Sequence, residues 1–430
     1  MGKVGLEPVP ILTAGGTIPL SAGRPGTEAP AGWRWFRLTD LARLETGHTP
    51  SRNHPEWWGG PIPWISLADI RELDGKVAQD TIEHTNEEGI ANSSARLLPE
   101  GTVVLSRTAS VGFVTIMGRA MATSQDFVNW VCGPELDPRF LAYLLRASRA
   151  YIRSLSSGAI HQTVYMPTVE SFFMSAPSVS RQREISESLT RHLAAVERAR
   201  TAAEEQTEAA RSLSSSYLRQ AFGTPEARAW PRVRLVDVLT APLRTGISRP
   251  TAPSSSKRCL TLSAVRSGTL DLAASKPTDV SDLEAKGNWV LPGAFYVVRG
   301  NGNRSLVGRG GFAPQTIEPS VLYPDLLIQV VTDSQVVIPE YLRFVWDSDE
   351  VRRDLEGRAR TAAGIYKISQ GNLAEVKVPL PSVAVQRYVA RLLKGELARA
   401  EEAQTSIGEE LMRIAALPAA LLRRAFAAEL

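Results

Sequence analysis

Two long stretches of the sequence carry apolar or small residues at steps that alternate between four and three positions. Within residues 181–222 these positions are Ile185, Leu189, Val196, Ala199, Ala203, Ala210, Leu213 and Tyr217, with His192 and Gln206 in the remaining places. Within residues 385–427 they are Val389, Leu393, Ala400, Ala403, Ile407, Ile414, Leu417 and Leu421. This spacing is typical of helices that pair in a coiled coil. The pattern therefore predicts two long helices.

The ends and the packing of these helices follow from neighbouring residues. Gly223 and Pro225 end the first helix. Pro418 lies inside the second helix and should kink or fray its last turns. Neither helix can bury its apolar stripe alone, so we expect the two to pack against each other. The chain between them is long enough to return, which makes an antiparallel coiled coil natural and would put one globule at each end of a rod.

The chain also contains a long internal repeat. Residues 177–222 begin PSVSRQREI and end LRQAF, and residues 381–426 begin PSVAVQRYV and end LRRAF, with one constant separation of 204 positions. The stretches before the helices also start alike: Trp33, Arg37, Leu38 and Asp40 match Trp230, Arg234, Leu235 and Asp237, each 197 positions later. A repeat of this length predicts a pseudo-two-fold architecture in which a globule and a long helix occur twice.

Each globule mixes strand and helix signals. β-branched runs typical of strands occupy 102–106, 113–117 and 127–131 in the first, and 259–265, 294–300 and 326–332 in the second. A helix should start at Asp137-Pro138, with Asp as the N-cap, and run to about Leu155; another should follow Pro339. The predicted fold class is α/β (α+β), with two tandem domains.

The domain boundaries follow from these patterns. We expect a first globular domain over residues 33–180 and a second over 230–384, with the long helices over 181–223 and 385–427. Residues 1–32 contain several Gly and Pro and no sustained period, and are interpreted as a flexible N-terminal tail.

Composition narrows the class of protein. The chain has 430 residues, 43% of them hydrophobic and 22% charged, and a net charge of +4. No apolar run approaches the ~18 residues of a membrane helix, and no signal peptide is visible. Its two cysteines, Cys132 and Cys259, lie in apolar runs and should pack as small apolar side chains. We therefore expect a cytoplasmic protein with no membrane partner.

Motifs for catalysis are missing from the sequence. A DNA amino-methyltransferase needs a Pro-rich loop such as Asn-Pro-Pro-aromatic, and the chain contains no Asn-Pro pair. No GxxxxGK[ST] loop for nucleotide phosphates occurs, and the five histidines show no metal-ligand spacing. The sequence therefore favours a protein without catalytic residues, metal site or cofactor of its own.

Several segments resemble one family. The run GHTPSRNHPEWWGGPIPWISLADI (47–70), the run LLPEGTVVLSRTASVGFVTI (97–116) and TSQDF (123–127) resemble a target-recognition domain in the specificity (S) subunits of Type I restriction-modification enzymes. APSVSRQREI (176–185) and LPSVAVQRYV (380–389) resemble that family's entry into its helices. In the second half no GxTPS run precedes 259–265, and RGNGNRSLVGRGGFA (299–313) replaces the SRTASVGFV segment.

The resemblance implies a specific role. The chain would be the non-catalytic subunit that recognises a bipartite, asymmetric DNA site, each globule being a target-recognition domain for one half. The paired helices would set the spacing and dock two methyltransferase subunits, which would bind S-adenosylmethionine. A translocating endonuclease subunit could join the complex. Two further functions stay open: a specificity subunit of a related phage-defence methylation system without a nuclease, and a coiled-coil scaffold that binds proteins rather than DNA.

The residues suited to DNA contact are Arg, Asn, Gln, Ser and Tyr on loops. In the first half the candidates are Arg52, Asn53, Arg107, Ser110, Ser124, Gln125, His161, Gln162 and Tyr165. In the second half they are Arg299, Asn301, Asn303, Arg304, Tyr366 and Lys367. The tryptophans Trp57, Trp58 and Trp64 are more typical of a core or a loop anchor than of a base-stacking platform.

Overall fold

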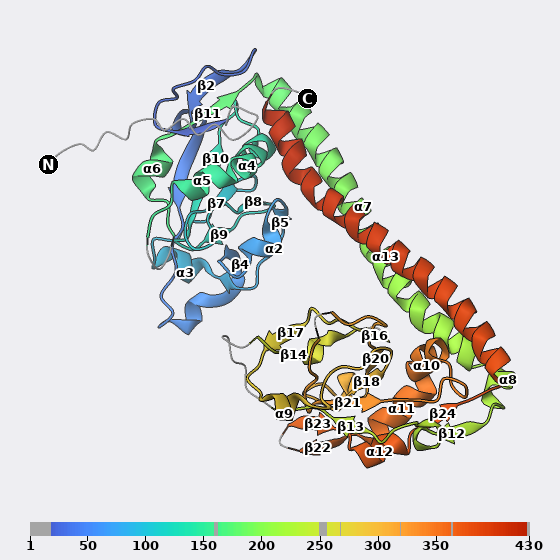
Figure 1. Ribbon diagram of the computed structural model, residues 1–430. Coiled ribbons are helices and arrows are strands. Elements are labelled where there is room, and N and C mark those ends of the chain that lie inside the picture. The colour runs from blue at the N-terminus through green and yellow to red at the C-terminus, as the bar shows by residue number, and fades with distance from the viewer. Residues whose placement is uncertain are drawn as a thin grey trace. The chain divides into compact units, whose positions relative to one another are not determined.

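The chain folds into two compact units, which are described separately. In this computed structural model the described residues are 19–158, 162–248, 256–266, 268–318, 320–362 and 364–427. The first unit comprises Met1–Ala203 with Glu410–Leu430, and the second comprises Glu204–Glu409. Each unit therefore contains one globule together with a part of both long helices (Figure 1).

The first globule is built around a five-stranded sheet that α4 covers. The strand order is β3 (Ala42–Thr46), β10 (Phe127–Cys132), β7 (Val103–Ser106), β8 (Val114–Met117) and β5 (Val77–Ala78), antiparallel except for the last pair. The helix α4 (Pro138–Ala147) packs on β7 and β8 and buries Phe140, Leu141, Leu144 and Leu145 completely. The strands predicted at 102–106, 113–117 and 127–131 are confirmed.

Smaller elements complete the first globule. Two three-stranded sheets contain β1 (Leu20–Ala22), β11 (Phe172–Ala176) and β2 (Arg34–Arg37), and β6 (His84–Thr85), β4 (Trp58–Ile65) and β9 (Ala122–Thr123). The other helices are α1 (Leu38–Leu41), α2 (Ile70–Leu73), α3 (Glu87–Ala91), α5 (Arg149–Ser154) and α6 (Met166–Glu170).

The predicted start of α4 is confirmed, and its predicted end is corrected. Pro138 occupies the first turn, and the Asp137 carboxylate accepts a hydrogen bond from the Phe140 N–H. The helix ends at Ala147, because the chain turns at Ser148 before α5 begins, so the helix does not run unbroken to Leu155.

The N-terminal tail is shorter than expected. The strand β1 pairs with β11, and Leu20 in it is only 2% exposed. The folded part therefore begins well before residue 33, since Leu20 fills a place in the core of the first unit. Residues 1–18 of the predicted tail lie outside the described residues.

The second globule repeats the plan with a six-stranded sheet. Its order is β13 (Arg244–Thr245), β21 (Leu327–Val330), β18 (Phe295–Val298), β20 (Gly310–Phe312), β16 (Gly268–Leu270) and β15 (Val265–Arg266). The remaining strands are β12 (Arg232–Arg234) with β24 (Lys377–Pro379), β14 (Arg258–Leu260) with β17 (Ser275–Pro277), and β19 (Gly300–Asn301) with β23 (Ile365–Lys367) and β22 (Arg360–Ala362). The helices are α8 (Pro225–Arg228), α9 (Asp282–Ala285), α10 (Pro339–Trp346), α11 (Asp349–Arg358) and α12 (Gln370–Ala374).

One strand predicted for this globule is wrong. The run 259–265 is not a single strand, because a 3-10 turn at Leu262–Ala264 separates β14 from β15. The Thr261 hydroxyl bonds to the Ser263 hydroxyl and to the Ala274 carbonyl. Such local bonds from hydroxyl side chains compete with a strand ladder. The runs 294–300 and 326–332 do contain strands, and the helix after Pro339 is confirmed.

The two long helices are confirmed. The helices α7 (Val179–Phe222) and α13 (Val383–Phe426) each have 44 residues, which corresponds to about 66 Å at ~1.5 Å per residue. In the first unit, the start of α7 (Ile185, Leu189) shares a core with the end of α13 (Leu422, Ala425). In the second unit, the end of α7 shares a core with the start of α13. Start meets end in both units, so the pair is antiparallel (Figure 1).

The predicted positions on each long helix form two rows seven residues apart, which on α7 run through Leu189 and through Ile185, and the structure corrects the second row. The row with Leu189, Val196, Ala203, Ala210 and Tyr217 faces inward, as does its α13 counterpart that begins at Leu393. The second row is correct at the start of each helix, where Ile185 and Val389 are buried, but farther along it lies one residue too early. Leu213 on α7 and Leu417 on α13 are 40% and 44% exposed. The half-buried positions are instead Leu193, Thr207, Ser214 and Ala221. Thr207 and Ser214 carry no apolar signal, so the pattern of apolar residues selects their neighbours instead.

The end of α13 does not fray after Pro418. The helix continues to Phe426, which is 2% exposed. The Phe426 ring lies 6.2 Å from the ring of Trp33 and 5.3 Å from that of Phe140, between ring centroids. In the second unit, Phe222 at the end of α7 packs on Trp230 and Tyr341 in the same way. Aromatic packing on a globule therefore holds the last turn of each helix.

Other sequence expectations concern cysteines, metals and membranes. Cys132 and Cys259 are free, and burial raises the pKa of each thiol to about 12, which fits their predicted apolar packing. Over the described ranges, His, Cys, Asp and Glu side chains form no group of three that could hold a metal ion. None of the described helices has both the length and the apolar character required to cross a membrane.

The corrected seam predicts how two leucines on α7 differ. Leu189→Ala removes a fully buried side chain and should lower the free energy of unfolding by about 2–5 kcal/mol. Leu213→Ala on the same helix should change it by less than about 0.5 kcal/mol, since Leu213 is exposed. Urea unfolding followed by circular dichroism measures both. Equal losses in the free energy of unfolding would show that Leu213 is buried, as the sequence pattern predicts.

Candidate nucleic-acid interface

The first unit presents a short loop between β7 and β8. Its tip, from the residue after Ser106 to the residue before Gly112, comprises the five residues 107–111. Two hydrogen bonds close it: Ser106 N–H donates to the Phe113 carbonyl at 2.9 Å, and Gly112 N–H donates to the Ser106 carbonyl at 2.9 Å. Gly112 has a φ of 85°, a conformation that favours glycine. The loop is therefore a hairpin tip with a defined base.

The second unit presents a longer loop between β18 and β20. It spans residues 299–307, nine in all. Val298 N–H donates to the Arg309 carbonyl at 2.8 Å, and Gly308 N–H donates to the Val298 carbonyl at 2.8 Å. Gly308 has a φ of 75°. The base of this loop therefore repeats the base of the first, around a tip that is four residues longer.

An arginine opens the first loop and is held on both sides. Its N–H donates to the Asp126 carbonyl at 2.9 Å, and its carbonyl accepts from the Val164 N–H at 2.8 Å. The guanidinium of this residue, Arg107, donates from Nη2 to the Gln125 carbonyl at 2.9 Å. Two other loops, 123–126 and 162–165, thus fix its backbone and side chain.

The second loop opens with an arginine in the same setting. Arg299 N–H donates to the Leu326 carbonyl at 2.8 Å, and the Arg299 carbonyl accepts from the Ile368 N–H at 2.8 Å. Its Nη1 donates to the Asp325 carbonyl at 3.4 Å. In both units the backbone N–H of the arginine therefore binds one carbonyl, and the arginine side chain binds the carbonyl of the preceding residue. Arg107 and Arg299 are structural equivalents.

This equivalence corrects one reading of the sequence. The segment 299–313 does not replace the SRTASVGFV segment, but is the same hairpin with a longer tip. Each hairpin is also fixed by an arginine from the helix behind it: Arg149 Nε donates to the Gly112 carbonyl at 2.8 Å, and Arg352 Nη2 donates to the Val307 carbonyl at 3.0 Å.

A glycine directly after β3 in the first unit and directly after β13 in the second shows that the start of the GxTPS run has a counterpart. A Cβ on Gly47 would lie 2.0 Å from the Ser124 carbonyl oxygen, and one on Gly246 would lie 1.9 Å from the Tyr323 oxygen. Only glycine fits such a close approach of two backbones. The next residues pair alike, since His48 N–H binds the Thr123 carbonyl and Ile247 N–H binds the Tyr323 carbonyl.

Arg52 is exposed but engaged within the protein. Its guanidinium makes two hydrogen bonds to the Glu83 carboxylate at 2.6 and 2.8 Å, and these raise the pKa of Arg52 and lower that of Glu83. It also lies 3.8 Å from the centroid of the Trp58 ring. Trp64 is 3% exposed and anchors the loop by donating to the His48 carbonyl, so the core reading of this tryptophan is confirmed. Asn53 is exposed beside them.

The remaining first-half candidates divide by exposure. Ser110 and Ser124 are buried, and Ser124 Oγ donates to Asp126 at 2.9 Å, so they support the loops in this conformation. Gln125 is exposed and bonds to Thr49, and Tyr165 is 57% exposed. The Gln162 carbonyl accepts a hydrogen bond from the Ala109 N–H, and the backbone φ of Ala109 is 57°. His161 lies outside the described residues.

The second-half candidates come together in one small sheet. Asn301 on β19 pairs with Tyr366 on β23, and Gly300 pairs with Lys367. Asn303 follows within the tip, where its N–H donates to the Asn301 side chain at 2.9 Å. Arg304 is exposed and donates to the Glu356 carbonyl at 3.1 and 2.7 Å. The predicted segments 299–304 and 366–367 therefore form one surface.

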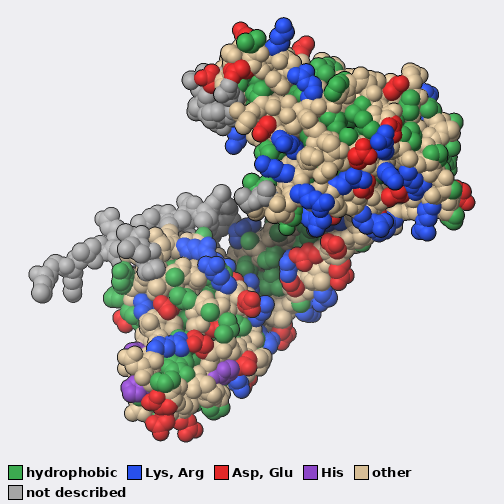
Figure 2. All heavy atoms as spheres, turned by 90° about the horizontal axis from the view of Figure 1, so that it is seen from below, with side chains coloured by type: hydrophobic (Ala, Val, Ile, Leu, Met, Phe, Trp, Pro, Cys, Tyr) green, Lys and Arg blue, Asp and Glu red, His purple; other side chains and the backbone are tan. Residues whose placement is uncertain are grey.

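Charge on the second unit suits a polyanion. Figure 2 shows Lys and Arg side chains gathered along one border of the unit that contains no histidine, which is the second unit. Positive surfaces of this kind attract nucleic acid through phosphate contacts.

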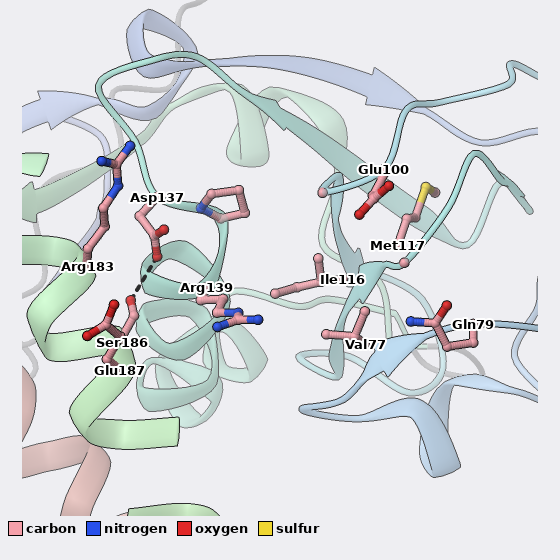
Figure 3. Close-up of a pocket in the computed structure, with 13 residues that line it drawn as sticks. Val77, Gln79, Glu100, Ile116, Met117, Asp137, Arg139, Arg183, Ser186 and Glu187 are labelled. Carbon is pink, nitrogen blue, oxygen red and sulfur yellow. Dashed lines mark hydrogen bonds between the residues drawn. The ribbon is translucent and has the colours of Figure 1, made fainter. Parts of the chain in front are cut away.

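A groove lies where each globule meets its long helix. In the first unit it measures about 550 Å³ and is lined by the start of α4 (Asp137, Arg139) and by Arg183 and Glu187 of α7 (Figure 3). In the wall of this groove, Ser186 Oγ on α7 donates a hydrogen bond to the Asp137 carboxylate at 2.8 Å.

The second unit has a matching groove of about 410 Å³, between the start of α10 and the α13 residues Arg387, Arg391 and Lys394. Arg387 is the repeat counterpart of Arg183, and Arg391 is that of Glu187. The chain thus presents two grooves in equivalent places, and the second is the more basic.

Sequence reasoning missed the relationship between the halves at their loops. Arg107 and Arg299 were both chosen, but not as counterparts. The signal was an Arg followed by Val-Gly at different spacings, in Arg107 to Gly112 and in Arg299 to Gly308. A gap-free repeat search passes over such a pair.

Comparison with known proteins gives one family. Residues 30–205 match the family described as Type I restriction modification DNA specificity domain. A specificity subunit of the Type I restriction enzyme MjaIX from Methanocaldococcus jannaschii is 27% identical over 158 residues, which are 36% of this chain and 37% of that relative. The EcoKI specificity subunit of Escherichia coli is 24% identical over 362 residues, 79% of this chain and 77% of the relative.

Solved structures share the fold. A chain of a type I R-M system, studied for its complex assembly and conformational transition, has a TM-score of 0.71 at 18% identity and covers 94% of this chain and 100% of its own length. The HsdS subunit from Thermoanaerobacter tengcongensis has a TM-score of 0.60 at 18% identity, over 94% of this chain and 99% of its own. The resemblance to specificity subunits is confirmed, and so is the layout of two domains and two packed helices.

The close approach at Gly246 predicts a large effect of one methyl group. Gly246→Ala would place a Cβ 1.9 Å from the Tyr323 carbonyl oxygen, and should lower the free energy of unfolding by about 1–3 kcal/mol. Gly302→Ala in the same unit meets nothing within 4 Å and should change it by less than about 0.5 kcal/mol. Thermal unfolding compares the two variants. Similar melting temperatures would show that the backbones at Gly246 are not held together.

Proposed function

We propose that this chain, a member of the Type I restriction modification specificity family through its residues 30–205, is the non-catalytic subunit that selects a DNA sequence. The observation that carries the proposal is the repeated frame. Each unit holds a hairpin loop, an arginine at its start and a tight glycine in the same arrangement. Two similar frames with different loop tips are suited to recognising two different sequences in one kind of ligand.

The site should be bipartite and asymmetric. The two loop tips have five and nine residues with different side chains, so they would prefer different bases. A homodimer of identical readers would instead select a palindrome. Half-sites on one face of a duplex recur every ~34 Å. The paired helices α7 and α13 are suited to fix such a spacing, because both are long and they pack together.

The partners should be two copies of one protein. The grooves beside α7 and α13 lie in equivalent places although their charges differ, and two surfaces in equivalent places fit two copies of one subunit. By resemblance to the family, these partners would be methyltransferase subunits, and S-adenosylmethionine would bind to them rather than to this chain. A translocating endonuclease subunit would complete a restriction enzyme; without it the same chain would serve a defence system that only methylates.

An exchange of one recognition domain tests the proposal. The full chain is co-expressed with the methyltransferase subunit of its own system, and methylated positions are mapped across the host genome. We expect a split motif. Replacing residues 33–180 by the matching segment of another specificity subunit should change one half of the motif and keep the other half and the spacer.

Three outcomes would contradict parts of the proposal. A palindromic motif would show that the two loops read alike, and a change in both halves would show that the domains are not independent. A chain that gives no sequence-dependent methylation or DNA complex with its methyltransferase would be a scaffold, and the DNA role would be lost. Replacing only the loop 299–307 is the matched control, because it leaves the first unit untouched.

A further inference from the structure

We propose that Arg107 and Arg299 are matched phosphate contacts, one for each half of the DNA site, and that the rest of each loop tip reads bases. This inference rests on the proposed function, since it requires that the ligand is DNA. It assigns different roles to residues that the sequence alone places in one class.

The first step is what the two units hold constant. Both arginines have backbone N–H and carbonyl groups bound by two neighbouring loops, and both direct one guanidinium nitrogen to a backbone carbonyl. A guanidinium has five N–H donors. In both arginines Nε is buried and one Nη hydrogen binds the carbonyl, which leaves at most three Nη hydrogens for a ligand. Both side chains are half-buried, which limits their motion while part of each stays at the surface. The fixed orientation is built into both units.

The second step is what the units vary. After Arg107 the tip contains Thr108, Ala109 and Ser110, whereas after Arg299 it contains a longer run with Asn301, Asn303 and Arg304. Residues that read different half-sites have to differ between the units. Residues that bind what both half-sites share can stay the same, and the sugar-phosphate backbone is what every duplex shares.

The third step excludes the alternative that these arginines read bases. An arginine reads guanine through O6 and N7 in the major groove. Two arginines with the same backbone bonds and matching side-chain acceptors would then require guanine at the same place in both half-sites, and the varied tips give no reason for this identity. Phosphate carries no such requirement, and a guanidinium binds it with two parallel hydrogen bonds.

Other arginines on these loops do not share these properties. Arg52 is neutralised by the Glu83 carboxylate. Arg304 gives two hydrogen bonds to the Glu356 carbonyl, and the first tip has no arginine within 108–111 to match it. Matched placement therefore singles out Arg107 and Arg299.

The test measures DNA affinity and its salt dependence. The full chain, combined with the methyltransferase subunit of its system, is titrated with a duplex that carries its methylation motif and with an unrelated duplex, at several concentrations of potassium chloride. Arg107→Gln and Arg299→Gln should each weaken binding to both duplexes by the same factor, on the order of tenfold for one charged hydrogen bond. The slope of log K against log salt should fall by about 0.9 for each arginine.

Two controls make the result specific. Arg119→Gln removes the same charge at the opposite end of the β7–β8 hairpin, where Arg119 pairs with Asp80, and should leave affinity and slope unchanged. Arg107→Lys keeps the charge and should retain most of the salt slope. The methylation motif should be the same in all of these variants.

Three results would overturn the inference. A change of motif in one half would make the arginine a base reader. Affinities equal to that of Arg119→Gln would show that neither arginine touches DNA. Loss of slope in Arg107→Lys as large as in Arg107→Gln would assign the residue a structural role in the loop. Failure of the proposed function looks different, because the unmodified complex would then bind both duplexes equally.

Discussion

The arrangement depends on one buried amide at the start of each long helix. Gln182 accepts a hydrogen bond from the Asp137 N–H at 3.0 Å and donates to the carbonyls of Glu135 and Pro177. Its counterpart Gln386 does the same with the Ile338 N–H and the carbonyls of Val336 and Pro381. Both residues are 1–2% exposed. Because each buried amide binds three backbone groups from two segments, it ties a globule helix to a long helix at a fixed point.

The same connection is closed at the other end of each helix by an aromatic ring. Phe426 packs on Trp33 and Phe140 in the first unit, and Phe222 packs on Trp230 and Tyr341 in the second. Each globule therefore packs against the start of one long helix and the end of the other. The helices are parts of both cores, so the boundary between the two units lies within α7 and within α13 rather than at their ends. A boundary drawn from the sequence at the helix ends describes the elements well but not the cores.

A structural feature could be predicted from the sequence when the same constraint repeats over many residues. The helices were predictable because burial along 44 residues imposes a period, and the row from Leu189 to Tyr217 follows it. The second row was displaced because Thr207 and Ser214 face inward without an apolar signal. The loops impose no period at all. Arg107 and Arg299 are linked through single hydrogen bonds to residues far away in the chain, and the four-residue difference in loop length hides them from an alignment at constant spacing.

These observations separate two kinds of residue within each unit. Gly47 and Gly246, the amides of Gln182 and Gln386, and the arginines at the loop starts have their partners in the backbone of other segments. Backbone partners do not depend on which side chains those segments carry, so the frame tolerates a change of loop sequence or length. Each tip keeps one apolar anchor just before its glycine, Val111 in the first unit and Val307 in the second, and both belong to the cores. The exposed tip residues between the arginine and this anchor are the part that can change in sequence and number, which allows one frame to hold two tips of different length in a single chain.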